Sequence, residues 1–156
     1  MGLHATVFCN CYELGRLRTQ PPHPESVYID EDGDLCCRNR LQVNEFDQWR
    51  QNACEHEWGR ANHHYIGNIA LVAFLRKKLG GSVETFPLIL NKVIYNGIHG
   101  GDYIQVDEVE KIQCEVINLR TVHSENHDDE NLLRRFEVQM SELVACSLEM
   151  KKPIVF

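Results

Sequence analysis

The sequence lacks the features that mark exported and membrane-bound proteins. No stretch of its 156 residues approaches the roughly 20 consecutive apolar residues that a bilayer-spanning helix needs. The first residues carry neither a basic region nor an apolar run of signal-peptide length. We therefore expect a cytoplasmic protein that does not associate with a membrane.

The sequence has fewer basic than acidic residues. The chain has 16 lysine and arginine residues against 23 aspartate and glutamate residues, which gives a formal net charge of −7. Proteins that bind nucleic acid gain much of their affinity from basic side chains that contact phosphates. We therefore expect no nucleic-acid partner, and a basic protein is the partner that this charge would suit.

Familiar catalytic signatures are also missing. There is no Gly-x-Ser-x-Gly motif, and no glycine-rich loop is followed by the Lys-Ser or Lys-Thr of a phosphate-binding loop. The sequence also has no internal repeat and no low-complexity segment. Its length, with 43% hydrophobic and 25% charged residues, is typical of a single globular domain over residues 1–156. These observations do not determine whether the protein is an enzyme, and they do not determine its oligomeric state.

Cysteine, by contrast, is abundant. The count is odd, and it includes a Cys-x-Cys and a Cys-Cys pair, whose members are too close in sequence to bridge each other easily. We expect reduced thiols, which serve as small buried hydrophobes, metal ligands or nucleophiles. The seven residues are Cys9, Cys11, Cys36, Cys37, Cys54, Cys114 and Cys146.

Four Cys and His residues form a candidate metal site. Cys9 and Cys11 are expected on the first strand, beside Cys36 or Cys37 on the predicted hairpin, and Cys54 and His56 are expected to arrive from the first helix. Thiolate and imidazole ligands suit tetrahedral zinc, but structural zinc sites usually pair cysteines two to four residues apart, which Cys-x-Cys does not match. The alternative is that these thiols pack in a core. No cofactor is favoured, and zinc stands as the alternative.

A glycine-rich segment is the candidate ligand loop. It contains His99, Gly100, Gly101 and Asp102, with a tyrosine on either side. Glycines allow the backbone to approach a ligand closely, while the imidazole and the carboxylate can titrate. The alternative is an ordinary helix C-terminal cap. Nucleophilic catalysis would need a thiol such as Cys54 or Cys114 beside His99.

Two adjacent histidines, His63 and His64, are expected in the first turn of a helix. The free N–H groups of a helix start favour neutral imidazoles, which can act as ligands or bases. The alternative is that the rings only satisfy neighbouring backbone groups. The sequence does not establish whether these residues meet His99.

Residue patterning predicts the order of elements. β-Branched and aromatic residues predict a strand over 3–11, prolines predict an exposed connection over 16–26, and Asp32-Gly33 predicts a hairpin over 27–37. Helical spacing predicts helices over 45–57, 62–79, 86–94 and 107–119, and a long one from Asp128 or Asp129 towards Pro153. A last short strand is expected over 154–156.

Strands that come first and helices that come later favour an α+β fold over a parallel α/β sheet. We expect a small antiparallel N-terminal sheet packed against four to five helices. Our first functional hypothesis is a small acidic cytoplasmic protein that binds another protein, as an inhibitor or immunity-type protein does. The alternative is a metal-binding protein or enzyme that uses the Cys/His group and the loop with His99 and Asp102.

Overall fold

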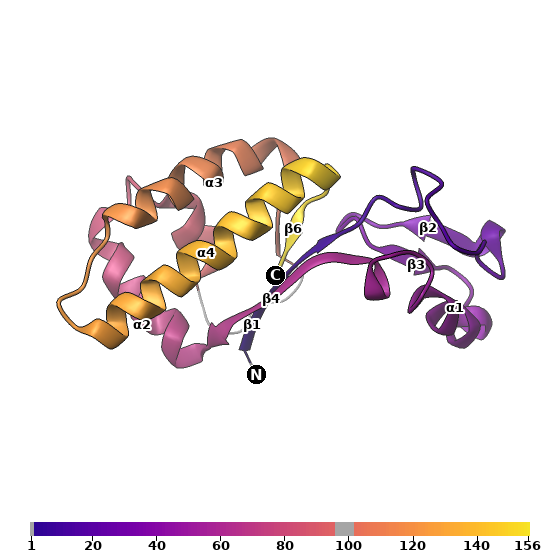
Figure 1. Ribbon diagram of the computed structural model, residues 1–156, viewed down its shortest axis with the longest axis horizontal. Helices are drawn as coiled ribbons and strands as arrows, with labels where there is room; N and C mark the ends of the chain where they lie inside the picture. Colours follow the sequence, from indigo (N-terminus) through magenta and orange to yellow (C-terminus); the bar gives the residue numbers. More distant parts are fainter. Residues whose placement is uncertain (1, 96–101) are drawn as a thin grey trace.

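The structure, a computed structural model, describes residues 2–95 and 102–156. It has the α+β architecture that the sequence predicts, with a four-stranded antiparallel sheet in the order β4-β1-β6-β5 (Figure 1). Strand β6 therefore lies between the first strand of the chain and β5. The strands are β1 (Gly2–Phe8), β4 (Arg60–Asn68), β5 (Tyr103–Ile104) and β6 (Ile154–Val155).

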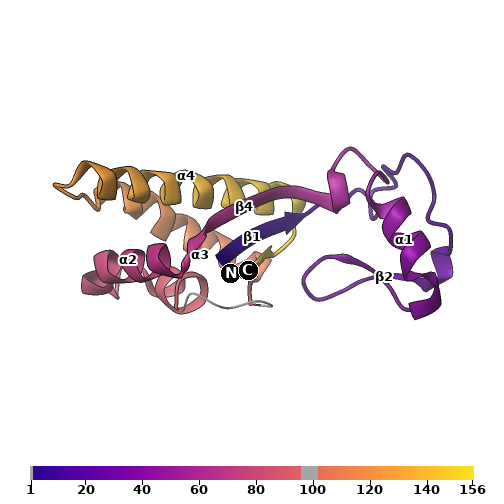
Figure 2. The same cartoon turned by 90° about the horizontal axis from the view of Figure 1, so that it is seen from below.

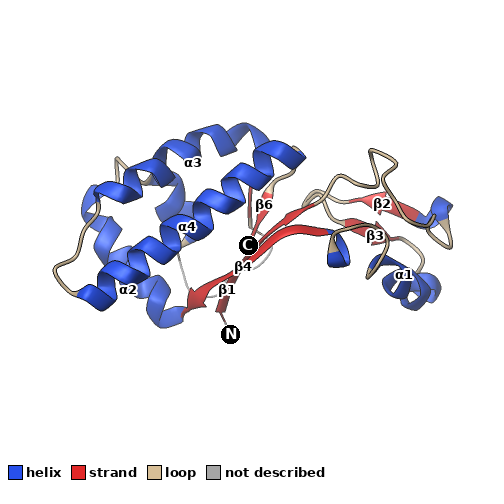
Figure 3. Ribbon diagram, in the orientation of Figure 1, coloured by secondary structure: helices blue, strands red, loops and turns tan. Residues whose placement is uncertain are grey.

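Helices cover one face of this sheet, and α4 runs along β4 (Figures 2 and 3). Residues in β1 alternate, with Leu3, Ala5 and Val7 buried and His4 exposed, so the first three face the helices. One buried apolar cluster joins the sheet and helices. The helices are α2 (Ile69–Leu79), α3 (Val106–Asn118), α4 (His127–Met150) and the short π-helical η5 (Ile89–Val93). Among the residues described, no helix is both long enough and apolar enough to cross a membrane.

Helix α4 confirms the long C-terminal helix. The side chain of Asn126 accepts hydrogen bonds from the backbone N–H groups of Asp128 and Asp129, so the cap lies just before the residues predicted for it. Three acidic residues in the first turn complement the helix dipole. The helix ends at Met150, and the next residue, Lys151, has a left-handed φ of 55°. Local signals therefore fix both ends of this element.

Residues 9–59 form a separate part of the molecule, which we call the distal lobe. It holds the predicted hairpin, β2 (Val27–Ile29) and β3 (Leu35–Cys37), and the short helix α1 (Val43–Arg50) (Figure 1). All of its residues are described, and none belongs to the apolar cluster of the sheet and helices. Its own buried hydrophobic side chains are few, namely Cys11, Phe46, Ala53 and Cys54.

Hydrogen bonds tie the distal lobe to the end of α4. The Nζ atom of Lys152, a residue only 5% exposed, donates to the backbone oxygen of Gly33 at 3.2 Å and pairs with Glu13. The side-chain amide of Asn10 donates to the backbone oxygen of Met150 at 3.0 Å. The segment that follows α4 thus contacts both the hairpin turn and the loop after β1.

The predicted helix over 62–79 is wrong in its first part. Residues 60–68 form β4, because Asn62 to Tyr65 pair with β1 across the sheet. The helix begins only at Ile69, where the side chain of Asn68 accepts the backbone N–H of Leu71 at 3.0 Å. Pairing with a distant strand has overridden the local apolar pattern. Strands and helices are consequently mixed along the chain rather than grouped.

Two other boundaries also differ from the prediction. The first strand ends at Phe8 instead of residue 11, and the first helix ends at Arg50 instead of residue 57. All four candidate metal ligands consequently lie in loops, not on a strand and a helix. Helix α3, by contrast, has a local start signal, a capping box formed by Gln105 and Glu108.

Candidate metal centre

Two loops of the distal lobe meet where the β1–β4 ladder ends. The backbone N–H of Cys9 donates to the carbonyl of Gly59 at 2.8 Å, and the N–H of Arg18 donates to the carbonyl of Ala53 at 2.8 Å. Trp58 and Gly59 have φ values of 57° and 67°, which turn the second loop back into β4. These contacts place the loop after β1 against the loop after α1.

The four predicted ligands converge at this meeting point. One ligand atom from each of Cys9, Cys11, Cys54 and His56 lies within 4.8 Å of all the others. The Sγ atoms of Cys9 and Cys54 are 3.7 Å apart, and Nδ1 of His56 is 3.4 Å from Sγ of Cys11 and 3.9 Å from Sγ of Cys54. Tetrahedral zinc with its usual bond lengths requires about 3.8 Å between two sulfurs and about 3.6 Å between sulfur and nitrogen. These three separations are close to those edges, and the other ligand atoms lie within 4.8 Å of one another.

Both loops present their ligands in the same way. Each supplies two ligands with one residue between them, Cys9 and Cys11 from the first loop and Cys54 and His56 from the second. The backbone N–H of His56 donates to Sγ of Cys54 at 3.4 Å, and the backbone N–H of Cys11 likewise hydrogen-bonds to the thiol of Cys9. The one-residue spacing therefore places both ligands of each loop in the same group.

Burial controls the protonation of these thiols. Desolvation raises the pKa of Cys9 to about 12, although the hydrogen bond from the Cys11 backbone opposes the shift. Desolvation also raises the pKa of Cys11. In the absence of a cation both side chains therefore keep their protons near neutral pH, which argues against a nucleophilic thiolate. A bound divalent cation reverses this preference, because coordination deprotonates a thiol.

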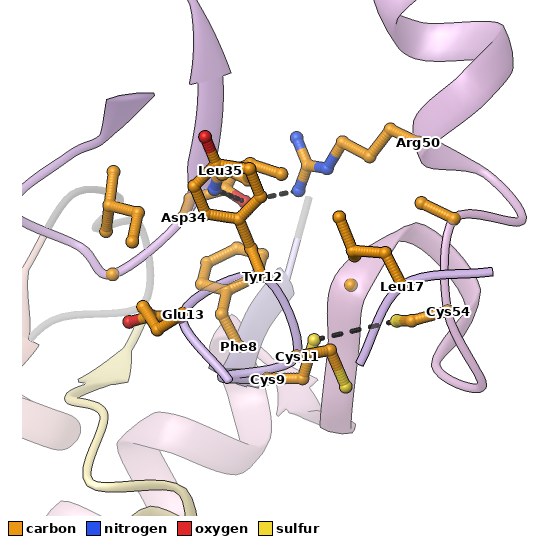
Figure 4. A pocket seen from close by; sticks show the side chains of 14 residues that line it. Phe8, Cys9, Cys11, Tyr12, Glu13, Leu17, Asp34, Leu35, Arg50 and Cys54 are labelled. Carbon is orange, nitrogen blue, oxygen red and sulfur yellow. Dashed lines mark hydrogen bonds and ion pairs between the residues drawn. The ribbon is translucent and has the colours of Figure 1, made fainter. Parts of the chain in front are cut away.

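A cavity of about 30 Å³ lies beside the sulfur atoms (Figure 4). Apolar side chains such as Phe8 and Leu17 line it, together with the ion pair of Asp34 and Arg50. Arg50 also donates to the backbone oxygen of Trp58 at 3.1 Å. Burial raises the pKa of Asp34 although Arg50 opposes the shift. A space of this size holds about one water molecule, so it is no substrate pocket.

Comparison of the chain with protein-family models, with curated proteins and with solved structures gives no match. The donor set must therefore indicate the chemistry. Three thiolates and one imidazole favour zinc over magnesium or calcium, which prefer oxygen ligands. Four protein ligands also complete a tetrahedral shell, as in structural zinc sites.

Of the four residues of the candidate ligand loop, the structure describes only Asp102, which lies apart from this centre. His99, Gly100 and Gly101 lie outside the described residues. Asp102 precedes β5, at the opposite edge of the sheet from β4. Its carboxylate accepts a hydrogen bond of 2.5 Å from the hydroxyl of Tyr95, and the two side chains line one cavity with Tyr103. The two tyrosines that flank the segment in sequence therefore both lie beside Asp102.

His63 and His64 do not share a site, because β4 directs them to opposite faces of the sheet. Nε2 of His64 lies 2.8 Å from Oε2 of Glu142 on α4. Nδ1 of His63 lies 2.8 Å from Oγ1 of Thr6 on the other face. Desolvation, with smaller contributions from Arg60 and other positive groups, lowers the pKa of His63. The expectation of a helix-terminal pair is thus wrong.

Proposed function

We propose that this protein binds one zinc ion through Cys9, Cys11, Cys54 and His56, and that the ion holds the fold of the distal lobe. The observation that carries the proposal is the convergence of four soft or borderline ligands, with three separations close to those of a tetrahedral zinc site. The two loops that supply them are far apart in the chain, since 45 residues separate Cys9 from Cys54. An ion at this point would therefore join segments that local structure cannot join.

The composition of the distal lobe explains why it would need such an ion. Its short hairpin and its eight-residue helix α1 bury few hydrophobic side chains, and Cys11 and Cys54 are two of them. Small folding units with so little core usually depend on disulfides or metals. All seven cysteines are free thiols in the structure, and of the two devices metal binding is the one that the convergence of Cys9, Cys11, Cys54 and His56 supports. Structural zinc contributes an apparent binding free energy of about 10–16 kcal/mol in zinc-finger peptides.

The closed ligand set bears on the other hypotheses. Catalytic zinc sites keep one coordination position for water or substrate, and here a fourth protein ligand would take that position. The proposal is therefore a structural site and not a metal-dependent enzyme. The hypothesis of an acidic protein that binds a basic partner stays a prediction, and it is compatible with a zinc-stabilised lobe.

Metal analysis of the full chain tests the proposal. We expect native mass spectrometry and elemental analysis of protein purified without chelator to show one zinc per chain. Cys54→Ser and His56→Ala should lose the metal, because each removes one ligand. Cys114→Ser is the matched control, since that thiol is exposed on α3. A wild-type chain that neither carries zinc nor takes it up when reconstituted would refute the site.

A further inference from the structure

Two histidines, a residue type that commonly binds metals, lie on the face of the sheet opposite the helices. The register of β1 and β4 places His4 opposite Tyr65 and Thr6 opposite His63. These residues alternate with the buried Leu3, Ala5 and Val7, so they share the other face. His4 and His63 are both exposed there. The pair is separate from the cysteine centre and does not depend on it.

The two imidazoles point a nitrogen atom at each other. Nδ1 of His4 and Nε2 of His63 are 3.4 Å apart, at the long end of hydrogen-bond distances. The ring centroids lie 5.4 Å apart with 20° between the ring planes, so the two facing nitrogens are closer to each other than the ring centres are. An ion about 2.1 Å from each nitrogen, the usual zinc–imidazole distance, would subtend about 108°, close to the tetrahedral angle.

Neighbouring side chains hold both rings. Oγ1 of Thr6 lies 2.8 Å from Nδ1 of His63, the ring nitrogen that does not face His4. Metal-binding histidines commonly donate this second N–H to an oxygen, which leaves the lone pair of the first nitrogen for the metal. The ring of Tyr65 packs against His4 with centroids 5.0 Å apart. The arrangement therefore limits the reorganisation that binding would require.

We propose that His4 and His63 chelate a late first-row divalent cation, with Thr6 as a positioning residue and water completing the coordination shell. Imidazole ligands suit zinc, nickel and copper better than magnesium or calcium. The positive charge of Arg60 acts on His63 and would repel a cation. Binding must therefore depend on coordination by the two imidazoles. The proposal assigns this face a metal site distinct from the cysteine centre.

Residue-resolved nuclear magnetic resonance tests this site. Ni²⁺ is the probe, because it is paramagnetic and broadens the signals of the residues that bind it. Added to zinc-loaded protein, it should broaden the signals of His4 and His63 before those of His123, a 72% exposed histidine elsewhere. His4→Ala should abolish this preference, and an exposed substitution of this kind leaves the core intact.

Thr6 provides the second variant. Thr6→Val keeps the β-branched shape but removes the hydroxyl, and it should weaken Ni²⁺ binding about 10- to 100-fold. Thr6→Ser should restore most of the affinity. The site is refuted if His4 and His63 broaden no earlier than His123, or if His4→Ala binds Ni²⁺ at this face as the wild type does. Because the readout is local to each histidine, it separates this site from the cysteine centre.

Discussion

The Sγ atoms of Cys9 and Cys54 lie 3.7 Å apart although 45 residues separate the two cysteines in the chain. The pairing crosses between loops, as does that of Cys11 with His56 at 3.4 Å. Each loop therefore supplies one member of each close pair. A zinc ion at this position would bond to both loops through two ligands each, so losing either loop would lose the ion.

Chelation should unfold the distal lobe selectively. We expect a strong chelator to remove amide hydrogen-exchange protection from residues 9–59, while α2, α3 and α4 stay protected by their own apolar cluster. Cys37→Ser should respond as the wild type does, because Cys37 is not in the ligand group. Uniform loss of protection, or no change, would contradict a local structural role for the metal.

Glu115 should be important for stability although it is a buried acid. Its carboxylate accepts the backbone N–H groups of Leu88 and Ile89, each at 2.9 Å, where η5 begins. Glu115→Ala leaves both donors without these acceptors, and we expect the free energy of unfolding to fall by about 2–4 kcal/mol. Glu110→Ala on the exposed side of α3 should change it by less than about 0.5 kcal/mol. If urea denaturation gives the same change in the free energy of unfolding for both variants, the hydrogen bonds that Glu115 accepts do not contribute to stability.

Glu108 should make stability depend on acid pH. Its hydrogen bond with Lys92, 2.7 Å in length, lowers its pKa below the usual 4.5. A lowered native pKa gives stability that is present above pH 4.5 and is lost as pH falls through the native value. The wild type should therefore lose stability more steeply below pH 4.5 than Glu108→Gln does. Parallel curves from denaturation at several pH values would contradict this assignment.

Lys152 should join the distal lobe to the rest of the molecule. Removing Nζ leaves the Gly33 carbonyl without this donor and Glu13 without this cation. We expect Lys152→Met to lower the free energy of unfolding by about 1–3 kcal/mol. Lys151→Met is the matched neighbour, because its side chain is exposed. If thermal denaturation gives the two variants the same stability, the contact contributes nothing.

Elements defined by local signals could be read from the sequence. The β2–β3 hairpin was predictable because Asp32-Gly33 favours a tight turn, and Gly33 has a φ of 77°. Helix α4 was predictable from its acidic start and its apolar stripe. The strand β4 was not, because its stability comes from pairing with β1, about 60 residues away, which no local window contains.

The candidate metal centre, too, could be predicted only in part from the sequence. The structure brings the four predicted ligand residues together, but it places them in loops instead of on a strand and a helix, and their spacing had counted against them. A spacing rule treats Cys9 and Cys11 as one pair, whereas the structure brings Cys9 close to Cys54 and Cys11 close to His56. The His4–His63 pair was missed because residues 62–65 were predicted as helix, and a strand prediction would have placed alternate residues on one face.

The position of β6 has a consequence for how the chain folds during synthesis. Val7 in β1 pairs with Ile154 in β6, and β6 in turn holds β5 in the sheet. On the ribosome, β1 can pair with β4 early, but the other edge of β1 stays unpaired until residues 154 and 155 have been synthesised. Contacts so distant in sequence form slowly, and an unpaired edge attracts other strands. Sheet closure is therefore a late folding step, during which the nascent chain is most exposed to aggregation.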